Sequence, residues 1–201
     1  MRKLPSTEFW NLIEAGHESR RIEFKSPFSW NDDKALWLCE KTIQTILGLT
    51  NTRDGGDIVI GINEKDDKGL DLVGLSKEQV SSFNYDLLKG TVDSFASSSC
   101  NFDVAEDQNE QFIVIRVSEF EEIPTICKKD GHNKELLRRG DIYCRSSSGP
   151  PATIRVTETE MREIIELAID KGQRKLMRRG YIHERAENSE DLFRQQRKDL
   201  E

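Results

Sequence analysis

The segment 51–64, with the sequence Asn-Thr-Arg-Asp-Gly-Gly-Asp-Ile-Val-Ile-Gly-Ile-Asn-Glu, places the strongest constraint on how this chain can fold. A Gly-Gly pair interrupts what precedes it, and the run 58–62 is short, β-branched and apolar at neighbouring positions. Such a run is typical of a strand that is buried on both faces. The segment therefore predicts a central strand, with the polar residues Asn63 and Glu64 at its exposed end, where functional sites are commonly built.

Shorter strands and helices are predicted on both sides of this strand. Residues 22–25 alternate between apolar and charged side chains, which indicates a half-buried strand with one polar face. Apolar residues recur at helical spacing from position 36 to position 47, so an amphipathic helix is expected to lead into the central strand. Residues 102–104 and 112–117 are predicted to be the two strands of a hairpin.

The last predicted helix begins near Thr157 and Glu160, which have the spacing of a capping box. Positions 161, 164, 165, 168 and 169 are expected to form its buried stripe, and Gly172 is expected to end it. Beyond this glycine the residues are almost all charged, with few apolar anchors. We therefore expect one folded domain over residues 1–172 and a charged helical or mobile tail over residues 173–201.

Length and charge limit the class of protein. A chain of 201 residues fits one domain with a single core. The formal net charge of -7 argues against a protein that coats nucleic acid indiscriminately, because such binding needs many phosphate contacts by Lys and Arg. Basic residues nevertheless gather at 20–21, 128–139 and 174–179. An acidic chain can still present a basic groove.

The four cysteines are scattered, without a Cys-x-x-Cys pair or a histidine at zinc-ligand spacing. We therefore expect reduced, mostly buried thiols rather than a zinc site or a disulfide framework. No apolar run approaches the roughly 18 residues that cross a bilayer, and the N-terminus lacks the apolar segment of a signal peptide. We expect a cytoplasmic protein with no membrane partner.

Three acidic residues, Glu18, Glu23 and Glu64, are candidate metal ligands and catalytic groups. They converge if strand 22–25 lies beside the central strand, and carboxylates at that density suit Mg²⁺ or Mn²⁺. Such an ion activates water and neutralises charge on a phosphodiester. Lys25 lies on the same strand face as Glu23 and is placed to stabilise a developing anion. The alternative is that Glu23 and Lys25 form a solvated strand face and Glu64 is an ordinary turn residue.

Four motifs in a fixed order make the assignment more specific. They are Glu18-Ser-x-x-Ile-Glu-Phe-Lys25, Asn51-Thr-x-x-Gly-Gly-x-Ile-Val-Ile-Gly-Ile-Asn-Glu64, Leu72-Val-Gly-Leu75 and Gly140-Asp-Ile-Tyr-Cys-Arg145. Over roughly residues 10–170 the chain resembles the Schlafen AlbA-like domain family, as a bacterial single-domain member.

The resemblance implies an α+β domain, with a mixed β-sheet flanked by helices, that is associated with nucleic acid. In vertebrate Schlafen proteins the corresponding core is a pseudo-dimeric horseshoe that cleaves tRNA-like RNA with three carboxylates. Glu18 and Glu23 match the first two, and Glu64 stands where the third is usually Asp, which lengthens that side chain by one methylene. Because this chain holds one such domain, a two-lobed groove requires two copies, and a homodimer is expected.

Seven basic residues are candidates for contacts with nucleic-acid phosphates, and the alternative for each is an ordinary solvated surface. They are Arg20, Arg21, Lys128, Lys129, Arg138, Arg139 and Arg145.

The leading hypothesis is an endoribonuclease that depends on Mg²⁺ or Mn²⁺ and acts on structured, tRNA-like RNA. In this hypothesis Glu18, Glu23 and Glu64 hold the ion. The same motifs occur in bacterial proteins described as DNA-binding regulators, so the alternative is a non-catalytic transcriptional regulator that binds DNA. A third class is a protein-interaction module that uses the charged tail.

Overall fold

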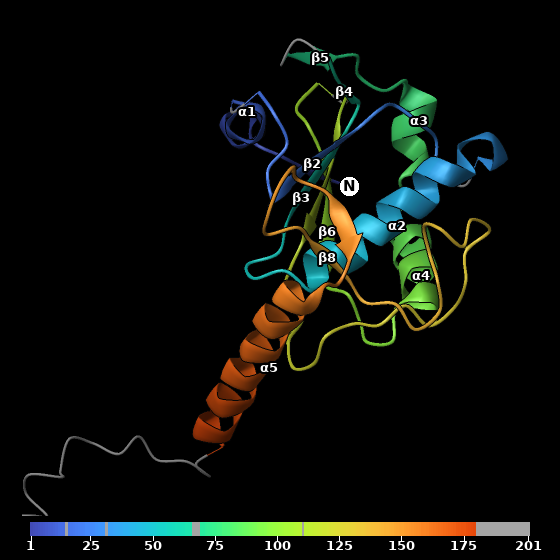
Figure 1. Ribbon diagram of the computed structural model, residues 1–201. Helices are drawn as coiled ribbons and strands as arrows, with labels where there is room; N and C mark the ends of the chain where they lie inside the picture. Colours follow the sequence, from blue (N-terminus) through green and yellow to red (C-terminus); the bar gives the residue numbers. More distant parts are fainter. Residues whose placement is uncertain (15, 31, 66–68, 110, 180–201) are drawn as a thin grey trace, which may run out of the picture.

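The computed structural model describes residues 1–14, 16–30, 32–65, 69–109 and 111–179 (Figure 1). In chain order its elements are β1 (Arg2–Lys3), α1 (Ser6–Ile13), β2 (Ile22–Lys25), the 3₁₀ helix η1 (Asp33–Ala35), α2 (Leu36–Thr50), β3 (Gly56–Ile60), β4 (Ile62–Glu64), β5 (Leu70–Leu72), α3 (Lys77–Ser82), α4 (Tyr85–Phe95), β6 (Phe102–Glu106), β7 (Ile113–Val117), β8 (Tyr143–Arg145), β9 (Thr153–Arg155) and α5 (Glu158–Arg178).

A five-stranded mixed sheet forms the centre of the fold, in the order β1-β6-β7-β3-β2. β2 lies parallel to β3, with Glu23 opposite Ile58, and β3, β7 and β6 follow one another in antiparallel order. α2 connects β2 to β3 and so supplies the crossover that parallel neighbours need. The predicted α+β class and the predicted hairpin of β6 and β7 are confirmed.

The central strand β3 is buried on both faces, as its sequence predicts, but it ends at Ile60. Gly61, with a φ of 112°, breaks the predicted strand, and Ile62–Glu64 form β4 in a separate two-stranded sheet with β5. Ile58 and Ile60 belong to the larger core cluster, which also includes residues of α2 and α4. Val59 points the other way, into a second cluster with Phe9 of α1. All three strand residues are fully buried. In Figure 1, α1 therefore lies on one side of the sheet, and α2 and α4 lie on the other.

Asn51, at the C-terminal end of α2, joins two later segments to the core. Its side-chain amide donates hydrogen bonds of 2.9 Å to the carbonyls of Thr125 and Tyr143, and its oxygen accepts the Thr125 N–H at 2.8 Å. The side chain is buried, so these backbone groups have no access to water as a substitute partner. One polar side chain thus fixes both the segment at Thr125 and the strand β8.

The two glycines that follow are required by close backbone contacts. Gly55 has a φ of 65°, and a Cβ on it would lie 2.0 Å from the carbonyl oxygen of Val117. A Cβ on Gly56 would lie 2.3 Å from the carbonyl oxygen of Arg21. Both contacts are too short for any side chain, so the Gly-Gly pair allows β3 to lie between β2 and β7.

α5 differs from its sequence prediction in three respects. It continues past Gly172 to Arg178, and Ile165 and Ile169 are 50% and 53% exposed rather than buried. The predicted capping box is also absent, because the Thr157 hydroxyl donates to the Glu160 carboxylate instead of capping a backbone N–H. The physical reason for the exposure is that the first turns of α5 pack on the body only through the side that carries Ile164 and Leu167, which leaves Ile165 facing away, and the later turns project from the body (Figure 1).

The cysteines, the membrane expectation and the predicted tail can also be compared with the structure. All four cysteines are free and buried, as predicted. Within the described ranges, no helix combines the length and the apolar character needed to cross a membrane. The first residues of the predicted tail belong to α5, and residues 180–201 lie outside the described residues.

We expect the substitution Asn51→Ala to lower the free energy of unfolding by about 2–4 kcal/mol, because it leaves buried backbone groups without partners. Urea denaturation monitored by circular dichroism measures the change. Asn101→Ala is the matched control, since it removes a single exposed hydrogen bond to Glu121 and should cost less than about 0.5 kcal/mol. Equal losses in the two variants would contradict the role given to Asn51.

Candidate active site

Glu23 and Lys25 of β2 lie on the same face of the strand and are both buried, with 5% of each residue exposed. The Lys25 ammonium bonds one Glu23 carboxylate oxygen, and the Arg145 guanidinium bonds the other. These side chains follow the face of Ile58 and Ile60, which packs toward α2. The alternative of a solvated strand face is therefore wrong for this pair.

Arg145, at the end of β8, has no exposed surface. Besides Glu23, its guanidinium donates to the carbonyls of Ser19 at 2.8 Å and Arg20 at 3.2 Å, and to the Thr153 hydroxyl at 3.2 Å. Its backbone N–H donates to the hydroxyl of Thr52 at 3.1 Å. One buried cation thus ties β8 and β9 to the segment that leads into β2.

Glu18 and Glu64 lie at the surface edge of the same site. The Glu18 carboxylate accepts the Phe24 N–H at 2.9 Å, which fixes it against β2. The Glu64 carboxylate accepts the Glu18 N–H at 3.2 Å, so the end of β4 reaches the segment before β2. Glu18 is half-buried and Glu64 is exposed. The predicted convergence therefore brings Glu64 to Glu18 and places Glu18 beside Glu23.

The acids of this site differ in their tendency to hold a proton. Burial, together with repulsion from the Glu23 and Glu64 carboxylates, raises the pKa of Glu18 to about 7. Burial also acts to raise the pKa of Glu23, but Lys25 and Arg145 outweigh it and lower that pKa. Burial lowers the pKa of Lys25, and the ion pair with Glu23 opposes the shift. At neutral pH, Glu23 is therefore a fixed anion, whereas Glu18 exchanges its proton.

The three carboxylates do not fit a divalent ion as a complete set, because Lys25 and Arg145 occupy both oxygens of Glu23. In the part of the chain that the structure describes, no three His, Cys, Asp or Glu side chains are grouped closely enough to hold a metal ion. Glu18 and Glu64 fit better as a pair. For each of them, only one carboxylate oxygen is hydrogen-bonded to the described residues. Mg²⁺ often binds through one or two carboxylates and keeps several waters.

The basic residues predicted near β2 are placed differently from one another. Arg20 is half-buried, donates to the Arg145 carbonyl at 3.4 Å and pairs with Glu163 of α5. Arg21 is exposed and lies 3.9 Å from the Asp54 carboxylate. Arg145 is enclosed by protein groups, so its predicted contact with phosphate is replaced by the structural role described above.

The remaining basic candidates, Lys128, Lys129, Arg138 and Arg139, are exposed on the connection between β7 and β8. This connection lies beside α4 in Figure 1, and the Lys129 ammonium lies 4.2 Å from the Phe95 ring centre. Asp130 accepts the Arg139 N–H at 2.8 Å, which folds the two ends of the group together. These four residues therefore form one solvent-facing basic surface.

Sequence reasoning missed two contacts that shape the site. Arg145 was expected at the surface, and nothing in its local sequence marks it as the partner of Glu23. Glu163 carries no motif, yet it attaches α5 to Arg20. Both contacts join residues more than a hundred positions apart in the sequence, so the opposite charges are seen to be partners only once the chain is folded.

Comparison with known proteins places the site within a family. A family model described as Schlafen, AlbA_2 matches residues 18–150, which is more than half of the chain and includes Glu18, Glu23, Glu64 and Arg145. No curated protein matches the chain.

Comparison with solved structures finds matches that include proteins from two organisms. The DIP2311 protein from Corynebacterium diphtheriae has a TM-score of 0.49 and 14% identity, over 79% of this chain and 27% of that one. The N-terminal domain of a RecG-related protein from Nitrosomonas europaea has a TM-score of 0.38 and 18% identity, over 78% of this chain and 90% of that one. The chain thus spans only 27% of the length of the Corynebacterium protein.

The raised pKa of Glu18 predicts how stability depends on pH. The pKa rises from an ordinary 4.5 to about 7 on folding, so the folded state keeps the proton over this window and stability falls as pH increases through it. Glu18→Gln retains an oxygen for the Phe24 N–H but carries no charge. Allowing for partial solvent screening, we expect this variant to exceed the wild type by about 1–2 kcal/mol near pH 8 and by about nothing near pH 4.

Urea denaturation at a series of pH values measures this difference. Glu14→Gln, an exposed glutamate at the end of α1, controls for the loss of one negative charge. A gain for Glu18→Gln that is the same at every pH, or that Glu14→Gln reproduces, would contradict the assignment.

Proposed function

The chain belongs to the Schlafen AlbA_2 family, and from this premise we propose that the protein acts on nucleic acid and cleaves structured, tRNA-like RNA at the candidate active site. The observation that supports cleavage is the convergence of Glu23 from β2, Glu64 from β4 and Glu18 from the segment before β2. Glu18, with a pKa of about 7, can exchange a proton at neutral pH. Groups with such perturbed pKa values are typical of catalytic sites.

The five charged residues of the site differ in exposure, and this difference assigns them different roles in the proposed reaction. Glu18 and Glu64 face solvent and can reach a bound strand. Glu23, Lys25 and Arg145 lie behind them, fully engaged with one another. In the proposed reaction the first two contact the substrate, and the other three hold the first two in place and set their charge.

Glu18 is the proposed general base. A carboxylate with a pKa near 7 accepts a proton efficiently at neutral pH, and the group that gives it up is the attacking hydroxyl. In an RNA strand the attacking group is the 2′-hydroxyl, which DNA lacks. Its oxygen bonds the neighbouring phosphorus as the P–O5′ bond breaks, water protonates the departing 5′-oxygen, and a 2′,3′-cyclic phosphate remains. Mg²⁺ or Mn²⁺ held by Glu18 and Glu64 would supply charge neutralisation for the phosphodiester and would lower the pKa of Glu18, so the general-base role of Glu18 applies to the site without an ion.

Incubation of the protein with tRNA, in Mn²⁺ or in EDTA, tests the proposal, with products separated on a denaturing gel. We expect cleavage by the wild type and a loss of about 100-fold or more in Glu18→Gln, with a comparable loss in Glu64→Gln. Glu158→Gln is the matched control, because Glu158 is an exposed glutamate at the start of α5 and pairs only with Arg162.

Cleavage that persists in both Glu18→Gln and Glu64→Gln would rule out this site.

The second candidate function is a non-catalytic regulator that binds DNA. The observation that favours it is that Lys25 and Arg145 neutralise Glu23 inside the protein. In that case no tRNA is cleaved, and duplex DNA binds equally well with and without a chelator, with an affinity that declines as salt increases.

The proposal includes a homodimer, because a two-lobed groove needs two copies of this domain. The apolar row of Ile165, Ile169 and Leu176 on α5 supports it. Their spacing of four and seven residues places them on one side of the helix, and they are 50%, 53% and 42% exposed. A second copy of the chain would bury this row.

Light scattering measures the mass of the protein in solution and tests this part of the proposal. We expect a dimer for the wild type and a monomer for the double variant Ile165→Glu, Ile169→Glu, because burying two carboxylates at the contact is costly. The control is Val73→Glu with Leu87→Glu, at two positions of similar exposure on other elements. A monomeric wild type would refute the dimer, and equal dissociation by the control would refute the surface.

A further inference from the structure

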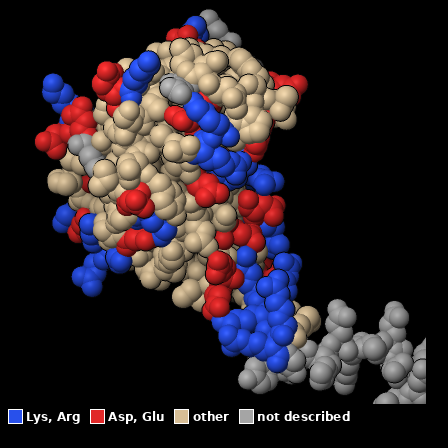
Figure 2. Space-filling model, turned by 180° about the vertical axis from the view of Figure 1, so that it is seen from behind, with Lys and Arg blue, Asp and Glu red and all other residues tan. Residues whose placement is uncertain are grey.

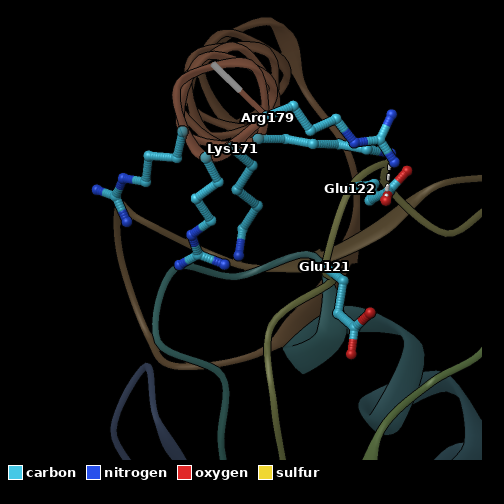
Figure 3. Close-up of a pocket in the computed structure, with 7 residues that line it drawn as sticks. Glu121, Glu122, Lys171 and Arg179 are labelled. Atoms are coloured by element: carbon cyan, nitrogen blue, oxygen red, sulfur yellow. Dashed lines mark hydrogen bonds and ion pairs between the residues drawn. The ribbon is translucent and has the colours of Figure 1, made fainter. Parts of the chain in front are cut away.

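Five basic residues gather at the projecting end of α5 and are here called the α5 cluster: Lys171, Arg174, Lys175, Arg178 and Arg179. They line a surface hollow of about 610 Å³ together with Glu121 and Glu122 from the connection after β7. Figure 3 shows the basic side chains spreading from α5, with Arg179 extending toward Glu122. From behind, Figure 2 shows a continuous blue area at the end of the helix.

Internal acids neutralise only part of the α5 cluster. Lys171 lies 2.6 Å from the Glu119 carboxylate, and Lys175 pairs with Glu122. Within residues 1–179, as far as the structure describes them, Arg174, Arg178 and Arg179 form no ion pair. Their guanidinium groups repel one another at spacings of one helical turn. Three exposed arginines therefore remain available for an external anion.

The helix dipole alone does not explain why five basic residues gather at the end of α5. Basic residues in the last turn interact favourably with the helix dipole, but the effect fades within that turn, whereas the α5 cluster begins at Lys171. The whole chain is acidic, with a net charge of -7 that already includes the cluster, so the cluster is a local exception to a field that repels polyanions. Arginine, with its planar fork of donors, suits phosphate oxygens in particular.

We propose that the α5 cluster is a second phosphate-binding site, which holds the backbone of a nucleic acid whose other end lies at the candidate active site. This inference rests on the proposed function only in taking nucleic acid as the ligand; it does not require cleavage. The hollow is bordered by Glu121 and Glu122, and because Lys175 pairs with Glu122, the basic residues outnumber the acids that line it.

The position of α5 sets the length of nucleic acid that can occupy both sites. The helix starts beside the active site, where Glu163 pairs with Arg20 and Arg20 bonds the Arg145 carbonyl. From Glu163 to the arginines of the α5 cluster the helix rises roughly 17–24 Å, at about 1.5 Å per residue. At about 3.4 Å per nucleotide of one strand, the ligand must extend roughly five to seven nucleotides beyond the active site.

The α5 cluster and the apolar row of α5 occupy different sides of the helix. Arg174 and Arg178 are two residues from Leu176, and residues two apart on a helix point in nearly opposite directions. A dimer formed through the apolar row would therefore leave these arginines exposed. The second phosphate site and the proposed homodimer are compatible in one molecule.

Fluorescence anisotropy with a labelled RNA duplex of about 12 base pairs, titrated at several salt concentrations, tests the proposal. The variant is Arg174→Gln with Arg178→Gln. We expect the slope of log affinity against log salt to fall by about 2, and the affinity at low salt to fall about tenfold or more, because two phosphate contacts are lost. The matched control is Lys34→Gln with Lys77→Gln, two exposed lysines at the starts of η1 and α3, for which neither slope nor affinity should change as much.

A second variant is expected to change duplex affinity in the opposite direction. Glu122→Gln frees Lys175 from its internal partner, so we expect tighter duplex binding than for Glu78→Gln, which removes the same charge from an exposed position on α3. Circular dichroism of each variant checks that the helices remain folded.

The outcomes separate this inference from the proposed function. If the wild type binds the duplex but the arginine variant behaves like its lysine control, the second site is wrong and the function stands. If the wild type binds neither RNA nor DNA at low salt, both fail. If the arginine variant retains duplex binding but loses binding to phosphatidylserine vesicles, the α5 cluster serves a membrane surface and the proposal is overturned.

Discussion

The buried ion pair of Glu23 and Arg145 is the interaction on which the site depends. Removing two charges from water is costly, and such a pair persists only when further hydrogen bonds satisfy the remaining donors. Arg145 meets this condition through the carbonyls of Ser19 and Arg20 and the hydroxyl of Thr153, and Lys25 occupies the second oxygen of Glu23. The pair therefore fixes the segment before β2 against β8 and β9. Because Glu18 lies in that segment, a contact in the interior decides the position of an acid at the surface.

This arrangement also explains why neighbouring acids behave so differently. Glu23 has two cations beside it and stays ionised, whereas Glu18 has another carboxylate on either side and a pKa near 7. The strand order produces this contrast, since β2 lies at the edge of the sheet next to β3, and β4 continues directly from β3. Glu23 remains ionised in the interior, and Glu18 at the surface can gain or lose a proton. This combination suits proton transfer to or from a bound strand.

α5 is attached to the site at its start and projects from the body at its end. Its first turns pack through Ile164 and Leu167, and Glu163 ties them to Arg20 beside the active site. Its last turns carry uncompensated arginines and exposed apolar side chains, which contribute nothing to the core of this chain. The two sides of the helix differ in chemistry, one basic and one apolar, and they are the surfaces proposed above for nucleic acid and for a second copy of the chain. The helix thus links the candidate active site to surfaces that a single domain does not bury.

The sequence by itself determined the elements whose reasons are local. The β-branched run 58–60 required a strand buried on both faces, and the alternation of residues 22–25 set which side chains face the two sides of the sheet. The Gly-Gly pair marked a close approach of backbones. It also brought Glu18, Glu23 and Glu64 into one hypothesis. Only the tertiary structure decided that Arg145 neutralises Glu23, that Glu64 reaches Glu18 rather than completing a triad of free carboxylates, and that α5 projects with Ile165 and Ile169 exposed. The physical reason is that periodicity shows which residues are apolar but not which surface is present to cover them, and that a buried charge selects its partner by distance in space, which local sequence does not encode.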